Sequence, residues 1–328
     1  MNLAKKFLIA SVLLLSALLL GICLGSVHIP IAEVLRSIVE KTRWSQILWN
    51  VRFPRVLLSV IAGAGLSVVG NAFQGLLKNP LVDPYLLGIS SGASFGAVVA
   101  IFLAEVLNAS FLREVPTLTF VFGIVAALLA LILARRQNTV PVTELILSGV
   151  LINILFSAAT VLFVMLAKRN ITHVYMWLFG TFSGTGWRDI PVPLLSVAGF
   201  TILTSGLGIQ LNAMSLGETE AMTSGVEVEK LKMLVYITGT FTTAAIVSRT
   251  GMIGFVGLIV PHMARRIFGN DHRISIPTSA VLGGLLLCTC DVISRTALSP
   301  SEIPVGVITA FVGAPVMFVL LRRSGRSV

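Results

Sequence analysis

The sequence predicts an all-α, polytopic membrane protein with about ten transmembrane helices, organised as one membrane domain over residues 1–328. Hydrophobic residues make up 55% of the chain and charged residues only 12%, with a mean hydropathy of +0.95. A soluble domain carries about 25% charged residues. Charge-free runs long enough to cross ~30 Å of hydrocarbon recur along the whole chain. They are apolar on all faces, which favours helices over the alternating strands of a β-barrel.

Ten such runs define the predicted spans. The first follows Lys5 and Lys6, a pattern shared with signal peptides, but nine further runs favour a retained helix. An even number of spans places both termini on one side, and basic pairs such as Arg265–Arg266 predict that this side is cytoplasmic. The runs lie at 7–32, 56–77, 84–104, 115–134, 145–167, 190–217, 233–248, 250–264, 274–290 and 303–321.

Small residues recur within these runs at intervals that suit helix packing. Gly88, Gly92 and Gly96 are four residues apart, and Gly63 and Gly70 lie in the second run. Small residues at this spacing let helices approach closely in a membrane. We therefore expect these glycines to lie at helix contacts.

Two hydrophilic segments are longer than a turn, at 33–55 on the predicted outer side and 212–232 on the inner side. In the inner segment, Ser215 followed three residues later by Glu218 predicts a capping box. Gly225 is placed to end the same helix as its C-terminal cap. Short helices at the cytoplasmic surface are the expected structure.

The sequence offers little for covalent chemistry or cofactor binding. It contains no Gly-x-x-x-x-Gly-Lys-Ser/Thr and no His-Glu-x-x-His pattern, so the chain by itself is expected to bind no ATP, metal or other cofactor and to be no enzyme. Cys23, Cys288 and Cys290 lie in or beside apolar runs, which excludes a disulfide framework. The net charge of +10 is attributed to orientation and lipid headgroups, not to nucleic acid.

Carboxylates are absent from the interior of all ten runs. Asp83, Glu144, Asp291 and Glu302 stand at run edges, and Asp291 could pair with Arg295 one helical turn away. Ion-driven carriers usually place carboxylates in mid-membrane. A secondary carrier or a channel therefore remains the alternative to a path driven by a partner, and a membrane enzyme would need clustered acids or histidines.

Several blocks, taken in order, resemble the FecCD-type permease subunits of ABC importers for iron–siderophore, haem and cobalamin. The likeness covers nearly the whole chain and implies a type II importer permease fold with ten spans. It also implies a homodimer or paralogous heterodimer in the cytoplasmic (inner) membrane, with ATPase subunits that bind ATP and Mg and an extracytoplasmic substrate-binding protein. The blocks are Arg52–Arg55, Gln74–Gly75, Asn79–Pro84, Gly88–Ala93, Leu216–Glu218, Gly225–Val226, Gly254–His262, Asp291 with Arg295, Pro304–Val307 and Gly313–Pro315.

The resemblance also implies three groups of functional residues. Outer-face arginines, whose planar forks suit carboxylates, would receive the binding protein: Arg52, Arg55 and Arg295. The inner loop would dock on the ATPase, with apolar anchors at Leu216, Ala221 and Val226 beside Gly217, Glu218 and Gly225. A cytoplasmic gate would use Asn79, Leu81 and Thr143, although Asn79–Pro80 and Asp83–Pro84 could simply form a rigid turn. The sequence does not identify the cargo.

Overall fold

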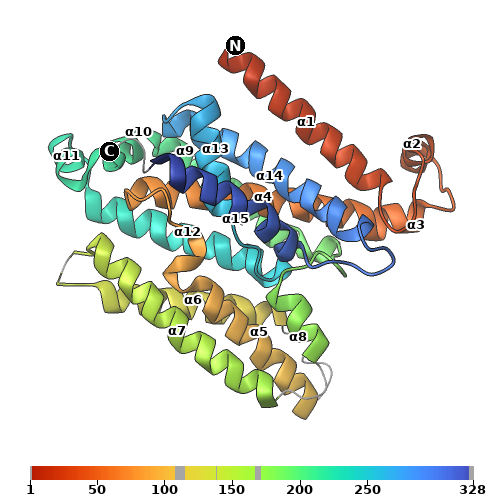
Figure 1. Ribbon diagram of the computed structural model, residues 1–328, viewed down its shortest axis with the longest axis horizontal. Helices are drawn as coiled ribbons and strands as arrows, with labels where there is room; N and C mark the ends of the chain where they lie inside the picture. Colours follow the sequence, from red (N-terminus) through yellow and green to blue (C-terminus); the bar gives the residue numbers. More distant parts are fainter. Residues whose placement is uncertain (1, 108–114, 138, 167–170, 325–328) are drawn as a thin grey trace.

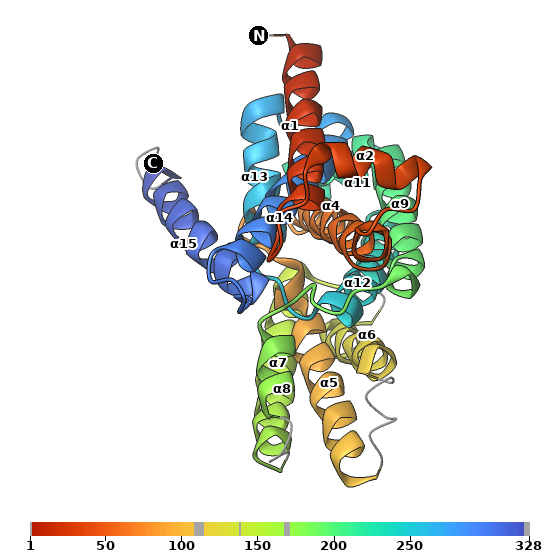
Figure 2. The same ribbon diagram turned by 90° about the vertical axis from the view of Figure 1, so that its right-hand side faces the viewer.

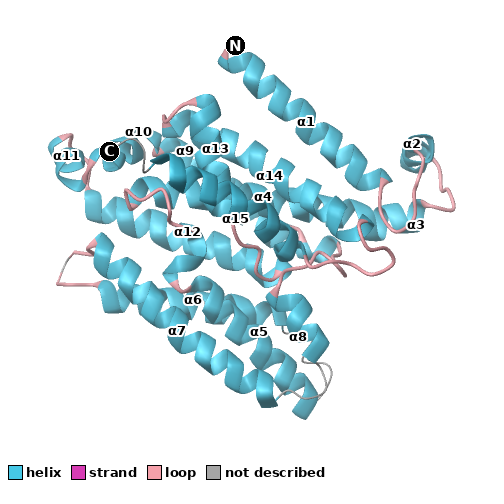
Figure 3. Cartoon of the chain, viewed as in Figure 1, coloured by secondary structure: helices cyan, strands magenta, loops and turns pink. Residues whose placement is uncertain are grey.

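The computed structural model describes residues 2–107, 115–137, 139–166 and 171–324 of the chain. Within these residues the structure consists of helices and loops, with a single isolated β-bridge between Arg136 and Thr139 (Figure 3). The all-α prediction is confirmed. Residue 167, the last of the predicted run 145–167, lies outside the described residues.

Every predicted apolar run corresponds to a helix or a helix pair (Figure 1). Run 190–217 is divided at Leu207 into α9 and α10. The helices are α1 (Leu3–Cys23), α4 (Phe53–Leu76), α5 (Ile89–Val106), α6 (Val115–Ala134), α7 (Val142–Leu166), α9 (Pro191–Gly206), α10 (Gly208–Leu216), α12 (Val228–Thr250), α13 (Val256–Phe268), α14 (His272–Thr296) and α15 (Val305–Ser324).

By length and composition, eight helical segments of the described chain can cross a membrane, and α15 is a further apolar helix over Val305–Phe318. The predicted span at 250–264 is the exception. Its helix, α13, has 13 residues and is roughly 20 Å long, too short for ~30 Å of hydrocarbon. The preceding stretch is not helical: Phe255 has φ 70°, and the Ile253 amide donates to the Tyr85 hydroxyl at 3.2 Å. Irregular backbone of this kind is tolerated at membrane depth only inside protein.

Short helices occupy the loops. Two lie before α4, and the second of them runs into it through a π-helical turn. One more begins the segment that leads into α5. Another, α11, forms the inner loop. These elements are α2 (Ile31–Val39), α3 (Ser45–Ile47), η1 (Leu48–Arg52), η2 (Pro84–Leu87), α8 (Ile171–Leu178), η4 (Trp187–Asp189) and α11 (Glu218–Thr223).

Helix α4 is the centre of the arrangement. In the apolar stretch of each candidate span, 83% of the residues are buried for α4 and 72% for α12. The same share is only 17% for α1 and 22% for α7. In Figure 2 the molecule is seen along the direction of α4, with α14 and α12 beside it and α5, α6 and α7 grouped below. Helices α1, α7 and α15 therefore form the rim.

Glycines on α4 allow this close packing. A Cβ at Gly70 would lie 1.9 Å from the Gly257 carbonyl oxygen of α13, and one at Gly63 would lie 2.1 Å from the Gly283 carbonyl oxygen of α14. Gly92 makes a similar contact, with a Cβ position 2.3 Å from the Phe122 carbonyl oxygen of α6. These distances confirm the predicted packing role of the glycines.

Enlarging Gly70 should separate α4 from α13. We expect Gly70→Val to destabilise the protein by at least about 1–3 kcal/mol, the usual cost of overpacking. The measurement is the thermal unfolding midpoint of the purified protein in detergent. Gly199→Val in α9 is the matched control, because a Cβ there meets no atom within 4 Å. Equal midpoints for the two variants would show that the contact tolerates separation.

Candidate functional site

The inner loop folds into a compact turn that glycines make possible. Helix α10 ends at Leu216, and Gly217 adopts φ +155°, with a Cβ position only 1.9 Å from Glu220 Oε2. Helix α11 follows and ends at Thr223, and Gly225, two residues further on, has φ +83°. The Gly225 amide donates to the Met222 carbonyl at 3.0 Å and the Val226 amide to the Ala221 carbonyl at 3.0 Å. This Schellman geometry confirms Gly225 as the C-terminal cap.

The predicted capping box is wrong. Ser215 lies in the last turn of α10, where its hydroxyl donates to the Leu211 carbonyl at 3.0 Å and lies 3.1 Å from His272 Nε2. Because Gly217 interrupts the helix, Ser215 belongs to the element before α11. Glu218 instead lies 2.9 Å from Lys232 Nζ.

The apolar side chains of this loop point in two directions. Leu216 is 69% exposed and Met222 is 54% exposed. Ala221 is fully buried, and Val226 packs beside it against the core that contains Tyr236. Ala221 therefore anchors α11 to its own chain and has no surface to offer a partner, whereas Val226 is only partly buried and its contact with a partner stays a prediction. Met222 was missed, since the sequence does not fix the rotational phase of so short a helix.

Lys232 connects this loop to the start of α7. Its side chain is 4% exposed, and Nζ lies 2.9 Å from Glu218 Oε1 and 2.8 Å from Glu229 Oε1. Nζ also donates to the Val140 carbonyl at 2.9 Å, and the Val140 amide donates to Glu229 Oε2 at 2.9 Å. The sequence analysis missed this group. Its only sequence signal is the i, i+3 spacing of Glu229 and Lys232.

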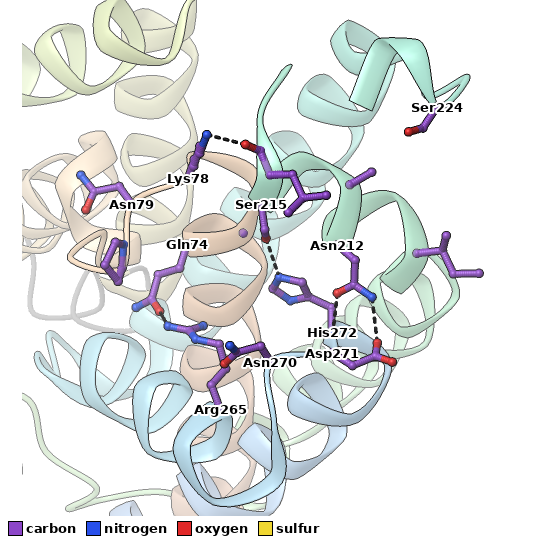
Figure 4. A pocket seen from close by; sticks show the side chains of 15 residues that line it. Gln74, Lys78, Asn79, Asn212, Ser215, Ser224, Arg265, Asn270, Asp271 and His272 are labelled. Atoms are coloured by element: carbon purple, nitrogen blue, oxygen red, sulfur yellow. Dashed lines mark hydrogen bonds between the residues drawn. The ribbon is translucent and has the colours of Figure 1, made fainter. Parts of the chain in front are cut away.

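A cavity of about 800 Å³ lies beside the loop, between the inner ends of α4, α10, α13 and α14. Figure 4 shows Arg265 donating to Gln74 and Lys78 donating to the Leu216 carbonyl across it. Asn212 donates to Asp271 at 2.8 Å, and together with the stronger contact from Arg273 this lowers the pKa of the Asp271 carboxyl. Charged side chains therefore line the cavity together with apolar ones such as Ile209 and Leu216.

Only some of the candidate gate residues line the cavity. Asn79 lines it, as does Leu216 of the inner loop. Leu81 is 44% exposed and Thr143 is exposed at the start of α7, and neither lines the cavity. Within the turn, Asn79 Oδ1 accepts from the Leu81 amide at 2.9 Å, and Asp83 Oδ1 accepts from the Tyr85 amide at 2.9 Å. Both contacts are those of a rigid turn.

At the opposite end of α4, the three candidate docking arginines are buried. Arg52 is 4% exposed, Arg55 is 6% exposed and Arg295 is 5% exposed. Arg52 Nη1 donates to the carbonyls of Ile22 at 2.6 Å and Cys23 at 2.7 Å. Arg295 Nη2 donates to the Gly21 carbonyl at 2.6 Å. These carbonyls belong to the last turn of α1, which has no helical partners for them.

Arg55 has two carboxylate partners within the chain. Its Nε donates to Asp291 Oδ1 at 2.9 Å, and its two terminal nitrogens donate to Glu302 at 2.7 and 3.0 Å. Asp291 also lies 3.4 Å from Arg295, as the spacing predicted. Because α14 continues to Thr296, Asp291 lies inside this helix and not at its edge. The expectation that these arginines are open to a partner is not met, since each is engaged within the chain.

Removing Arg55 should therefore act on stability. We expect Arg55→Ala to lower the free energy of unfolding by about 3–5 kcal/mol, because it leaves buried Asp291 and the facing Glu302 without their main partner. Thermal unfolding in detergent measures this. Arg36→Ala is the control, since its side chain is 70% exposed and lies 3.6 Å from Glu33, a contact worth about 0–1 kcal/mol. An unchanged midpoint with a salt-sensitive loss of binding-protein affinity would restore a docking role.

Comparisons with known proteins agree with this architecture. The model of the FecCD transport family matches residues 13–323. The chain is 39% identical to an uncharacterized ABC transporter permease of Bacillus subtilis, over 99% of this chain and 96% of that protein. It is 38% identical to a cobalamin import permease of Halobacterium salinarum, over 84% and 73%. The hemin transport permease of Yersinia pestis is 33% identical over 93% of both chains.

A solved structure titled as an inward-facing ABC transporter of metal-chelate type is also similar. It is 30% identical, with a TM-score of 0.84 over 98% of this chain and 99% of that one. The match extends over the central helices and both ends of α4. The chain therefore belongs to the FecCD transport family of ABC importer permeases.

Proposed function

We propose that this permease moves an iron chelate, haem or a cobalamin-type chelate inward across the cytoplasmic membrane. Relatives named for cobalamin, ferric dicitrate and hemin support this cargo class. One structural observation supports the ATP-driven mechanism: the inner loop is joined to the start of α7 by Lys232 and to the turn after α4 by Lys78. A movement of the loop would therefore reach both segments.

In this proposal the chain performs no covalent chemistry and binds no cofactor, while a partner ATPase holds ATP and Mg. Within the described residues, no group of three or more His, Cys, Asp or Glu side chains is placed to hold a metal ion. Two Gly-x-Ser-x-Gly segments occur, centred on Ser90 and Ser94. A nucleophile elbow requires a turn between a strand and a helix, whereas both serines lie in α5 and Ser94 donates to the Ser90 carbonyl at 2.8 Å.

The ATPase would dock on the exposed part of the inner loop. Leu216 and Met222 are the apolar side chains that project from it. Gly217 and Gly225 fix its shape, and Ala221 fixes it to the permease core. Because α11 is held at both ends, a push on it would move the loop as a rigid body. The cavity lined by Asn79 and Arg265 would change shape in the same step, with Leu81 and Thr143 nearby on the surface as further gate candidates.

The outer face would receive a soluble substrate-binding protein, and both termini would be cytoplasmic. Arg52, Arg55 and Arg295 would contribute indirectly, because they fix the ends of α1, α4 and α14 at the outer face. The docking contacts themselves would come from exposed side chains around these helix ends.

A second copy or a paralogous permease would pack against α7 and α15. Figure 2 shows α15 standing apart at the left, and α7 on the same side of the group that it forms with α5 and α6. Leu151 and Ile154 of α7 are 62% and 63% exposed, and Phe311 of α15 is 78% exposed. Such faces are suited to cover by a partner helix, and the translocation path would lie between the two copies.

The alternative, a secondary carrier, would need a carboxylate within the membrane that can bind and release a proton or another cation. Asp291 is fully buried, and its partners Arg55 and Arg295 lie at the outer end of α14. This arrangement favours a structural role for that carboxylate and supports the partner-driven importer.

Reconstitution tests the function directly. In proteoliposomes that contain the permease, its ATPase and its binding protein, we expect accumulation of a ferric siderophore, hemin or cobalamin only with hydrolysable ATP. A non-hydrolysable analogue is the control. Accumulation that persists without hydrolysis and follows an ion gradient would reject the importer in favour of a carrier.

Substitution of Lys232 tests whether the inner loop passes its movement to the segment before α7. We expect Lys232→Met to leave assembly with the ATPase intact but to reduce cargo moved per ATP hydrolysed by about 5-fold or more, within the usual range of coupling free energies. Lys232→Arg should recover part of the loss. The control is Lys230→Met two residues earlier, because the Lys230 side chain is 80% exposed and pairs with Glu227 on the surface. Equal transport per ATP in Lys232→Met and Lys230→Met would exclude this path.

A further inference from the structure

Helix α2 has three distinct faces. Ile31, Leu35, Ile38 and Val39 follow the i, i+4, i+7, i+8 spacing of a single helical stripe, and they are 53%, 61%, 58% and 85% exposed. Val34 and Ser37, on a second face, are buried against the chain. A third face presents Glu33 and Arg36. Among the described residues, the apolar stripe is thus the exposed face of α2.

The position of α2 places this stripe at one end of the molecule. In Figure 1, α2 lies at the end opposite to α11, beyond the C-terminal end of α1. Figure 2 shows it lying across the direction of α4 and α12. With nine residues it is roughly 14 Å long, so it cannot cross a bilayer. If the inner loop is cytoplasmic, α2 lies at the outer membrane boundary, in the plane of the membrane.

Two tryptophans attach α2 to neighbouring elements at the same end. Trp49 Nε1 donates to the Ser37 carbonyl at 3.2 Å, and Trp187 Nε1 donates to the Trp49 carbonyl at 2.6 Å. The two rings lie 6.4 Å apart and are 41% and 45% exposed. Tryptophan is enriched at the membrane–water interface, where its ring is in lipid and its N–H is bonded. Arg43, in the connection between α2 and α3, lies with its guanidinium carbon 4.9 Å from the centre of the Trp44 ring.

Exposed apolar side chains also recur between α1 and the stripe. Only 17% of the apolar stretch of α1 is buried. Leu20, near its outer end, is 53% exposed and Val27, in the connection to α2, is 46% exposed. Exposed apolar residues therefore occur on α1, on the connection and at Ile31, where the stripe of α2 begins.

We infer that α2 is an interfacial helix whose apolar stripe binds the acyl-chain boundary of the outer leaflet, with phospholipid as its partner. Its charged face then points to headgroups and water, as in other amphipathic helices at membrane surfaces. A soluble binding protein suits this face less well, because the stripe would be left in water whenever that protein is absent. The inference rests on the proposed orientation only for the choice of leaflet.

Spin labels can test this in the full-length permease in phospholipid nanodiscs. Cys23, Cys288 and Cys290 are replaced by alanine, and the label is attached at Leu35→Cys or Ile38→Cys. Arg36→Cys on the charged face is the matched control. We expect positions 35 and 38 to collide several-fold more often with oxygen, which dissolves in lipid, than with a water-soluble nickel chelate. Position 36 should show the reverse preference.

Three other results would contradict the inference that the stripe binds lipid. Nickel-chelate accessibility at position 35 equal to that at position 36 would place the stripe in water and overturn the inference. Exclusion of both reagents would assign the stripe to a second permease copy. Accessibility to nickel that disappears only when the binding protein is added would assign it to that protein. The measurement needs no ATPase. Its result is therefore independent of the transport assay that tests the importer function.

Discussion

The structure depends on the close approach of α4 to its neighbours. At Gly63 and Gly70, carbonyl groups of α14 and α13 occupy the space where a side chain would be. Polar contacts then join the same helices, as Asn71 donates to Ser279 at 2.8 Å and Gln74 donates to the Gly257 carbonyl at 3.3 Å. In a membrane, such contacts hold helices together because lipid supplies little hydrophobic driving force between them.

Because α4 is held along its length, its two ends have different surroundings. At the outer end, Arg55 is buried and bound to two carboxylates, and Arg52 is bound to backbone carbonyls. Charges buried in this way are costly to separate. At the inner end, Lys78 is exposed and reaches the Leu216 carbonyl beside a cavity of about 800 Å³. The outer end is therefore built to stay in place, whereas the inner end has room to rearrange.

This difference relates the fold to an importer driven from inside. A force applied to α11 would be carried by Lys232, which joins the loop to the segment before α7, and by Ala221, which packs in the core. The peripheral helix α7 is also little covered by its own chain, with 22% of its apolar stretch buried. Motion is easiest where few buried contacts must be broken. The rim helices are therefore better placed to move than α4.

The sequence by itself determined the membrane class, the order of the helices, the cap at Gly225 and the pairing of Asp291 with Arg295. These follow from partition into lipid, from the φ angle that glycine allows, and from the spacing of one helical turn, all of which are local properties. Only the tertiary structure decided which charged and apolar side chains are free. Arg55 meets Asp291 across 236 residues, Lys232 meets Val140 across 92, and Ala221 faces inward while Met222 faces out. Such contacts depend on which helices lie side by side and on their rotation, and no local pattern specifies either.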